Sequence, residues 1–240
     1  MDREHCYLCF TSLLERIINA NCRLFWSMCI EKTYESILRW VPRALIDSSA
    51  VVKQVEEYRQ FWKPKEVKVV LLAESHVFTE KQDSETKCKK LVMNEIIPNY
   101  PQHFARFVYC LGYGENEILE RTVKGNVGTP QFWKIFSSCV AESAENEHSL
   151  GFYKVLKTRT PHLEQRLWNK VNILRKMQER GIWLLDASIV GLYGSGIKNH
   201  RIKRRIIEIC WENHLANIVK KSQPKHIIVI GKGVESILGF

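Results

Sequence analysis

The sequence contains no long uninterrupted apolar run and few of the residues that make linkers. No stretch approaches the roughly 18 apolar residues that a membrane-spanning helix needs, and the start, MDREHCYLCF, mixes acids and bases unlike a secretion signal. Only 12 glycines and 7 prolines occur among 240 residues, with no repeat and no linker that would separate domains. We therefore expect a single domain over 1–240 without a membrane partner. An intracellular location is predicted, cytoplasmic or, in a eukaryote, nuclear.

The eight cysteines do not indicate a disulfide framework, because such frameworks accompany secretion. Four of them lie near the N-terminus: Cys6, Cys9, Cys22 and Cys29. The pair Cys6-x2-Cys9 would suit one half of a zinc site, but the spacing to the other two matches no common zinc pattern. We expect reduced, buried thiols and predict no metal site and no cofactor.

Basic charge is concentrated in the second half of the chain. Residues 1–120 carry 16 Lys and Arg against 17 Asp and Glu, a net charge of −1, whereas residues 121–240 carry 20 against 9, a net charge of +11. An excess of this kind attracts a polyanion such as DNA, although a solvated basic surface without a partner fits the composition equally well.

Three short apolar runs are predicted to be buried strands: 67–73 (VKVVLLA), 182–187 (IWLLDA) and 226–231 (HIIVIG). Apolar residues at helical spacing from Leu163 to Met177, and again from Ile202 to Ala216, predict helices between the strands. Alternating helices and strands indicate a three-layer α/β/α sandwich with a mainly parallel central sheet. This α/β core would cover 63–240, and residues 1–62 would form an N-terminal helical extension.

Polar residues follow all three predicted strands. Glu74, Ser75 and His76 end the first run, Asp186 lies near the end of the second, and the sequence Gly231-Lys232-Gly233 follows the third. Ligands of parallel sheets bind outside the carboxyl ends of the strands, so these residues are candidates for one site. Because loops are polar in any case, the pattern alone does not prove a site.

The order of these motifs resembles the uracil-DNA glycosylase superfamily over about residues 65–240. That resemblance implies an α/β/α sandwich that flips a damaged base out of DNA and hydrolyses its N-glycosidic bond without a metal. We also expect a monomer. The resemblance also implies catalytic roles for Glu74 and Ser75, stacking of the flipped base on Phe78, and base reading by Asp186. Glu74 would orient water or stabilise the cationic sugar.

Several positions depart from the family pattern. His76 replaces its usual Pro, Ser75 replaces the Asp of its best-known branch, and Asp186 replaces an Asn. An ionised Asp186 offers only acceptors, so a base with adjacent donors, such as guanine or protonated cytosine, suits it better than uracil. The alternative is that Asp186 caps its own loop.

The family's His-containing loop has no counterpart before Phe240, which leaves open whether the chain continues beyond that residue or lacks the element. His76 could replace the missing imidazole as a donor to the leaving base, or it could be an ordinary loop residue.

The segment LYGSGIKNHRIKRR (192–205) is predicted to contact DNA phosphates. Its glycines let backbone N–H groups approach an anion, and cations follow at the start of a predicted helix. The candidate phosphate ligands, including one cation beyond the third strand, are Gly194, Ser195, Gly196, Lys198, Arg201, Lys203, Arg204 and Lys232.

Two alternatives to a glycosylase stay open at this stage. The altered first motif favours a catalytically inactive nucleic-acid or nucleotide-binding module of the same fold. A small-molecule enzyme acting on a nucleoside would use Glu74 and Asp186 but would not need the basic half. The aromatic residues of 100–115 and 129–136 are expected to be mainly core.

Overall fold

The computed structural model describes residues 28–141 and 151–239. Its described helices and strands, in chain order, are α2 (Ser49–Phe61), β1 (Val69–Ala73), α3 (Lys81–Ser84), α4 (Lys90–Ile96), α5 (Pro130–Val140), α7 (Leu163–Glu179), β2 (Ile182–Asp186), α8 (His200–Cys210), α9 (Ala216–Ser222), β3 (His226–Ile230) and α10 (Lys232–Leu238). Residues 28–38 are also helical, and short turns of 3₁₀-helix lie at η1 (Arg43–Leu45) and η2 (Asn116–Ile118).

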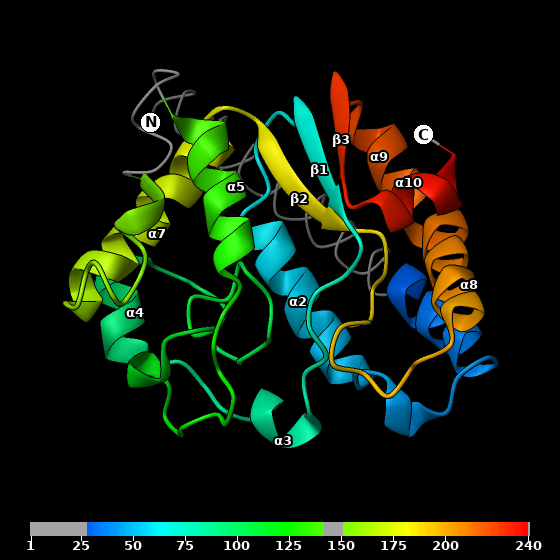
Figure 1. Cartoon of the computed structure of the whole chain (residues 1–240), viewed down its shortest axis with the longest axis horizontal. Helices are drawn as coiled ribbons and strands as arrows, with labels where there is room; N and C mark the ends of the chain where they lie inside the picture. Colours follow the sequence, from blue (N-terminus) through cyan, green and yellow to red (C-terminus); the bar gives the residue numbers. More distant parts are fainter. Residues whose placement is uncertain (1–27, 142–150, 240) are drawn as a thin grey trace, which may run out of the picture.

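The three strands form one small open parallel sheet in the order β2-β1-β3 (Figure 1). The sequence predicted all three strands and their parallel direction, and the structure confirms them. The central strand β1 is buried from Val70 to Ala73, as its continuous apolar run requires. β3 is an edge strand whose side chains are partly exposed, and Ile228 is 52% exposed.

Helices lie to both sides of this sheet in Figure 1, with α5 and α7 on the side of β2, α4 below α7, and α8, α9 and α10 on the side of β3. α7 packs on α5 and β2, and α10 packs on α8 and β3. α7 ends before Gly181, whose φ of +76° is favourable only for glycine, in agreement with the C-terminal cap that the sequence predicted.

The expected helix over 202–216 is longer and contains a π-helical turn. α8 continues through η3 (Trp211–Leu215), a π-helical segment, into α9, which ends at the left-handed residue Gln223 just before Pro224. Asn213, the one polar residue in the expected apolar stripe, lies in the π-helical turn, and its carbonyl accepts a hydrogen bond from the Cys29 thiol.

The described part of the predicted N-terminal extension packs into the common core. Ile30, Tyr34 and Ile37 from the first described helix, and Val55 and Tyr58 from α2, belong to the same buried cluster as the strands. Cys6, Cys9 and Cys22 lie outside the described residues. The described cysteines are free thiols: Cys29, Cys88, Cys110, Cys139 and Cys210.

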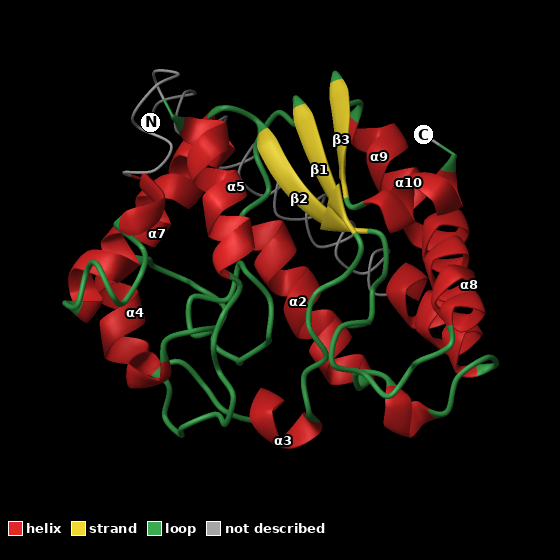
Figure 2. Ribbon diagram, viewed as in Figure 1, coloured by secondary structure: helices red, strands yellow, loops and turns green. Residues whose placement is uncertain are grey.

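Most of the chain between β1 and α5 is loop, as Figure 2 shows. This segment is nevertheless rich in buried aromatic side chains, as its sequence led us to expect: Tyr100, Phe104, Phe107, Tyr109 and Tyr113. The Tyr109 hydroxyl accepts a hydrogen bond from the backbone N–H of Leu184, 2.9 Å away, and so covers part of the outer edge of β2.

Candidate functional site

The chain segments that leave β1 and β2 stay paired beyond the ends of the strands. Ala73 is in register with Asp186, and the N–H of Ser188 donates to the carbonyl of Glu74 at 3.0 Å. Further on, Val77 and Tyr193 form a parallel bridge. Glu74 and Asp186 therefore lie at one edge of the sheet, which is the condition for a site at this place.

The carboxylate of Asp186 points into the protein and is already bound there. Its side chain is 1% exposed, and its Oδ2 accepts a hydrogen bond of 3.0 Å from Nη2 of Arg59 in α2. Arg59 is itself buried, donates to Glu56 one turn earlier and lies over the ring of Phe107 at 5.4 Å. In this structure the carboxylate is therefore the charge and hydrogen-bond partner of a buried guanidinium.

His76 is buried between two aspartates. Its Nε2 lies 3.2 Å from Oδ2 of Asp47, and its Nδ1 lies 3.5 Å from Oδ2 of Asp186, an ion-pair distance without good hydrogen-bond geometry. Burial lowers the pKa of His76, but the two aspartates outweigh burial and raise the pKa to about 9. The imidazole is therefore charged at neutral pH, and both nitrogens face protein carboxylates.

Asp47 completes this group and joins three loops. Its Oδ1 accepts from the N–H of Thr79 at 2.7 Å, and its Oδ2 accepts from the N–H of Gly191 as well as contacting His76. Five buried residues of alternating charge thus form a chain, which we call the alternating-charge network: Asp47, His76, Asp186, Arg59 and Glu56. It connects α2, the loop before α2 and the ends of β1 and β2.

The remaining candidates at the end of β1 differ in burial and in whether their side chains already have hydrogen-bond partners. Ser75 is buried, donates to the carbonyl of His76 and accepts from the N–H of Leu192 at 3.0 Å. Phe78 is half-buried. Glu74 is also half-buried, and within the described residues its carboxylate makes no hydrogen bond or ion pair. Of the three residues predicted to be catalytic, only Glu74 has a free side chain.

The Gly-rich loop before α8 lies at the surface, as the sequence predicted. Gly194 is exposed with φ +72°, and Gly196 packs so closely on Leu45 that an added Cβ would come 2.5 Å from a leucine methyl. The Ser195 hydroxyl stays within the loop, because it donates to the carbonyl of Leu192. Asn199 caps α8 by accepting from the N–H of Arg201 at 2.9 Å.

The cations that follow the loop are largely unneutralised. Lys198 and Arg201 are exposed and Lys203 is half-buried, and none of the three forms an ion pair with a described residue. Arg204 is exposed but pairs with Glu208 at 2.9 Å. Lys232 begins α10, which Figure 1 places beside the end of α8 that is farther from the Gly-rich loop, so it is not part of this group.

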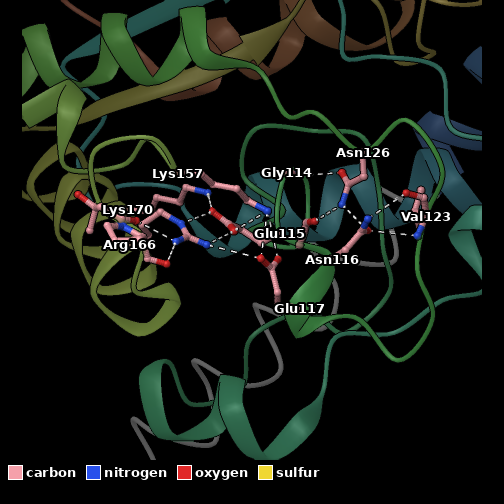
Figure 3. A network of polar contacts seen from close by, with 12 residues as sticks. Gly114, Glu115, Asn116, Glu117, Val123, Asn126, Lys157, Arg166 and Lys170 are labelled. Atoms are coloured by element: carbon pink, nitrogen blue, oxygen red, sulfur yellow. Dashed lines mark hydrogen bonds and ion pairs between the residues drawn. The ribbon is translucent and has the colours of Figure 1, made fainter.

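A second buried charged cluster surrounds Glu115, between the loop that carries it and α7 (Figure 3). Glu115 is 1% exposed and receives hydrogen bonds from Arg166 Nη2 at 2.8 Å and from Lys170 Nζ at 2.7 Å. Lys157 and Glu117 extend the cluster to the surface, with about half of each side chain exposed. Because its central groups are paired with each other, this cluster fastens the loop around Glu115 to α7.

Comparisons with known proteins give no relative for this chain. No family model, no curated protein and no solved structure matches it. Two further features are absent from residues 28–141 and 151–239. No helix there is long and apolar enough to cross a membrane, and no group of three or more His, Cys, Asp and Glu side chains is arranged to hold a metal ion.

Sequence reasoning missed Arg59 and Asp47. Arg59 left a signal, because it falls four residues after Val55 and three before Trp62, on the buried face of α2, where a charge needs a partner. Asp47 left none, since an aspartate just before a helix is ordinarily read as part of a cap. Its contacts all lie far away in the sequence.

Proposed function

We propose that this chain is a DNA-binding protein with the three-layer α/β/α fold of the uracil-DNA glycosylase superfamily, and that Asp186 and His76 stabilise its fold. DNA binds at the surface formed by the Gly-rich loop and the start of α8. This corresponds to the non-catalytic alternative that the altered first motif favoured.

The burial of Asp186 carries this proposal. A residue that reads a flipped base must offer its hydrogen-bonding atoms to that base. The 1% exposed carboxylate of Asp186 is bound to Arg59 and lies beside a charged His76. Turning it toward a base would leave Arg59 with a single carboxylate partner, Glu56, which costs several kcal/mol for a buried charge.

The unpaired cations supply the binding part of the proposal. Like charges this close together repel one another, so Lys198, Arg201 and Lys203 destabilise the free protein slightly. DNA phosphates remove that cost and release counterions. Exposed backbone at Gly194 allows a phosphate to approach closely.

Binding to short fluorescein-labelled DNA, measured by anisotropy between about 50 and 200 mM salt, tests the proposal. Log K should fall linearly with log salt concentration. The double variant Lys198→Glu/Arg201→Glu should weaken binding and make the slope shallower by roughly 1 to 2 units, because two phosphate contacts are lost.

The matched control is Lys90→Glu/Lys134→Glu, which changes net charge equally but alters exposed residues of α4 and α5. It should leave the slope unchanged. If both double variants lost the same DNA affinity, binding would depend on net charge alone and not on this surface. An affinity that does not change with salt would reject DNA binding.

Glycosylase activity is the second candidate, and the free carboxylate of Glu74 favours it. In this case Glu74 would position water or stabilise the cationic sugar, as the family resemblance implies. Oligonucleotides with different damaged bases, single- and double-stranded, are incubated with the protein and then cleaved with alkali. Cleavage product formed by the parent protein but not by Glu74→Gln supports catalysis. DNA binding by the parent without any cleavage product supports the non-catalytic binding module.

A further inference from the structure

Two large aromatic side chains are exposed next to the cations of α8. Trp40 is 54% exposed and Tyr193 is 59% exposed. Tyr193 directly precedes the Gly-rich loop, and Trp40 lies just after the first described helix. Aromatic rings of this size are ordinarily buried because each removes a large apolar area from water, so two on one surface need an explanation.

Trp40 and Tyr193 belong to one surface although they are far apart in the sequence. The guanidinium of Arg205 lies 5.4 Å from the centre of the Trp40 ring, which connects Trp40 to α8. Gly196 packs on Leu45, which connects the Gly-rich loop to the segment that follows Trp40. We call this surface the aromatic-basic surface (residues 39–45 and 193–205).

The backbone that carries Tyr193 is fixed while its ring stays in solvent. The Tyr193 carbonyl accepts a hydrogen bond of 2.7 Å from the N–H of Phe78, and the residue is bridged to Val77. Gly191, two residues earlier, lies directly against the backbone of Phe78. A ring held in this way loses little backbone freedom when a ligand stacks on it, so more of the contact energy appears as affinity.

The charges of the aromatic-basic surface are predominantly positive. Its cations are Arg39, Arg43, Lys198, Arg201, Lys203, Arg204 and Arg205. Three acids face some of them: Glu208 pairs with Arg204 and Arg205, Glu212 lies 4.0 Å from Arg205, and Glu35 lies 3.9 Å from Arg43. Arg39, Lys198, Arg201 and Lys203 have no such partner among the described residues, so the surface complements a polyanion.

We propose that Tyr193 and Trp40 stack on unpaired bases of a single-stranded nucleic acid whose phosphates contact the cations of the aromatic-basic surface. In a duplex the base faces are covered by neighbouring bases, so exposed rings add affinity only for a strand with free bases. The inference rests on the proposed nucleic-acid binding and adds that the surface selects unpaired nucleotides.

The test compares three labelled oligomers of equal length with the full chain: oligodeoxythymidine, a duplex of mixed sequence, and an abasic strand that keeps the phosphates but has no bases. Binding should be tightest for oligodeoxythymidine. Tyr193→Leu and Trp40→Leu keep apolar bulk and remove the ring. Each should weaken that binding by roughly 5- to 100-fold, leave binding of the abasic strand unchanged and leave the salt slope unchanged.

Trp168→Leu is the control, because Trp168 is also partly exposed but lies in α7, beside β2 in Figure 1. It should bind every oligomer as the parent does. Circular dichroism of each variant shows whether it is folded. Tyr193→Phe keeps the ring, so it should bind oligodeoxythymidine as tightly as the parent does, unlike Tyr193→Leu.

The outcomes separate this inference from the proposed function. Stacking is rejected, and DNA binding is kept, if Tyr193→Leu and Trp40→Leu bind as tightly as the parent in a salt-dependent way. The same holds if the abasic strand and oligodeoxythymidine bind equally well. No binding to any oligomer rejects both. An oligouridine of the same length tells DNA from RNA: tighter binding of oligouridine would keep the stacking and replace DNA by RNA as the partner.

Discussion

The Nε2 atom of His76 lies 3.2 Å from Oδ2 of Asp47, which comes 29 residues earlier in the sequence. Both side chains are fully buried, and the same oxygen also accepts the backbone N–H of Gly191. This contact joins the loop before α2 to the chain segments that follow β1 and β2. The pair therefore holds in place the edge of the sheet at which ligands of parallel sheets bind.

The stability of the fold should fall as pH rises from about 6.5 to about 9. His76 has a pKa of about 9 in the folded protein against 6.5 for a free histidine. A group whose pKa is raised by folding stabilises the protein fully below its unfolded pKa, and that stabilisation is lost as pH rises through the folded pKa. The difference corresponds to about 3 kcal/mol of unfolding free energy.

Urea unfolding at several pH values between these limits measures the effect of His76. His76→Gln should be less stable than the parent at pH 6 and should lack most of the pH dependence. His226→Gln, which changes an exposed histidine of β3, should retain it. A parent protein whose stability is constant over this range would contradict a charged His76.

Breaking the contact between Arg59 and Asp186 should be strongly destabilising. Asp186→Asn or Arg59→Met each leaves a buried charge with too few partners, which costs roughly 3 to 5 kcal/mol. The double variant Arg59→Met/Asp186→Asn should lose less stability than the sum of the two single changes, and urea unfolding of the full cycle measures this coupling.

The comparison pair is Lys53 and Glu31, which interact at 2.6 Å but have side chains about half exposed. Removing either of them should cost no more than about 1 kcal/mol. If Asp186→Asn were as stable as the parent, Asp186 would be free for another role, and base reading would again be the better explanation of its position.

Glu115 should make the protein sensitive to acid. Burial raises the pKa of Glu115, but hydrogen bonds from Arg166 and the charge of Lys170 outweigh burial and lower it below the usual 4.5. A group with a lowered pKa stabilises the fold above its unfolded pKa, and this is lost as pH falls through the folded pKa. Glu115→Gln should lose roughly 3 to 5 kcal/mol at neutral pH, since two buried cations lose their main partner.

The half-exposed Glu117 provides the control for Glu115. Glu117→Gln should cost at most about 1 kcal/mol and should unfold in acid at the same pH as the parent. Thermal unfolding between pH 3 and 7 compares the three proteins, with Glu115→Gln expected to show the weakest dependence on acid. An equal dependence in all three would show that other carboxylates set the acid limit.

Much of the secondary structure could be predicted because it follows from local patterns. The runs that became β1, β2 and β3 are short, apolar and bounded by polar residues, and those features hold wherever the strands pack. The π-helical turn at Trp211–Leu215 could not be predicted, because a single π-turn hardly changes the spacing of apolar residues from that of a regular α-helix.

The candidate site was harder to predict, because the direction of a side chain depends on its tertiary partners. The position of Asp186 at the end of β2 followed from the sequence, but its inward orientation depends on Arg59, 127 residues earlier. Likewise, no local pattern predicts that His76 lies between two aspartates, because Asp47 and Asp186 are 29 and 110 residues away from it in the chain. The basic loop was predictable, since exposed cations beside glycines need no partner to stay at the surface.

Glycine at position 191 should be essential for the paired segments beyond β1 and β2, whereas Gly196 and Gly233 should tolerate alanine better. An added Cβ at Gly191 would lie 2.5 Å from the backbone nitrogen of Phe78, and backbone cannot move aside without disturbing the neighbouring bridge to Tyr193. Gly191→Ala should cost roughly 1 to 3 kcal/mol or more by overpacking.

At Gly196 the close atom is the terminal methyl of Leu45, which can rotate away, so Gly196→Ala should cost less than Gly191→Ala. Gly233→Ala, in α10 with open space around it, should be neutral or stabilise by up to about 1 kcal/mol. Urea unfolding of the three variants gives the order, and a Gly191→Ala protein as stable as Gly233→Ala would mean that the two segments are not packed together as described.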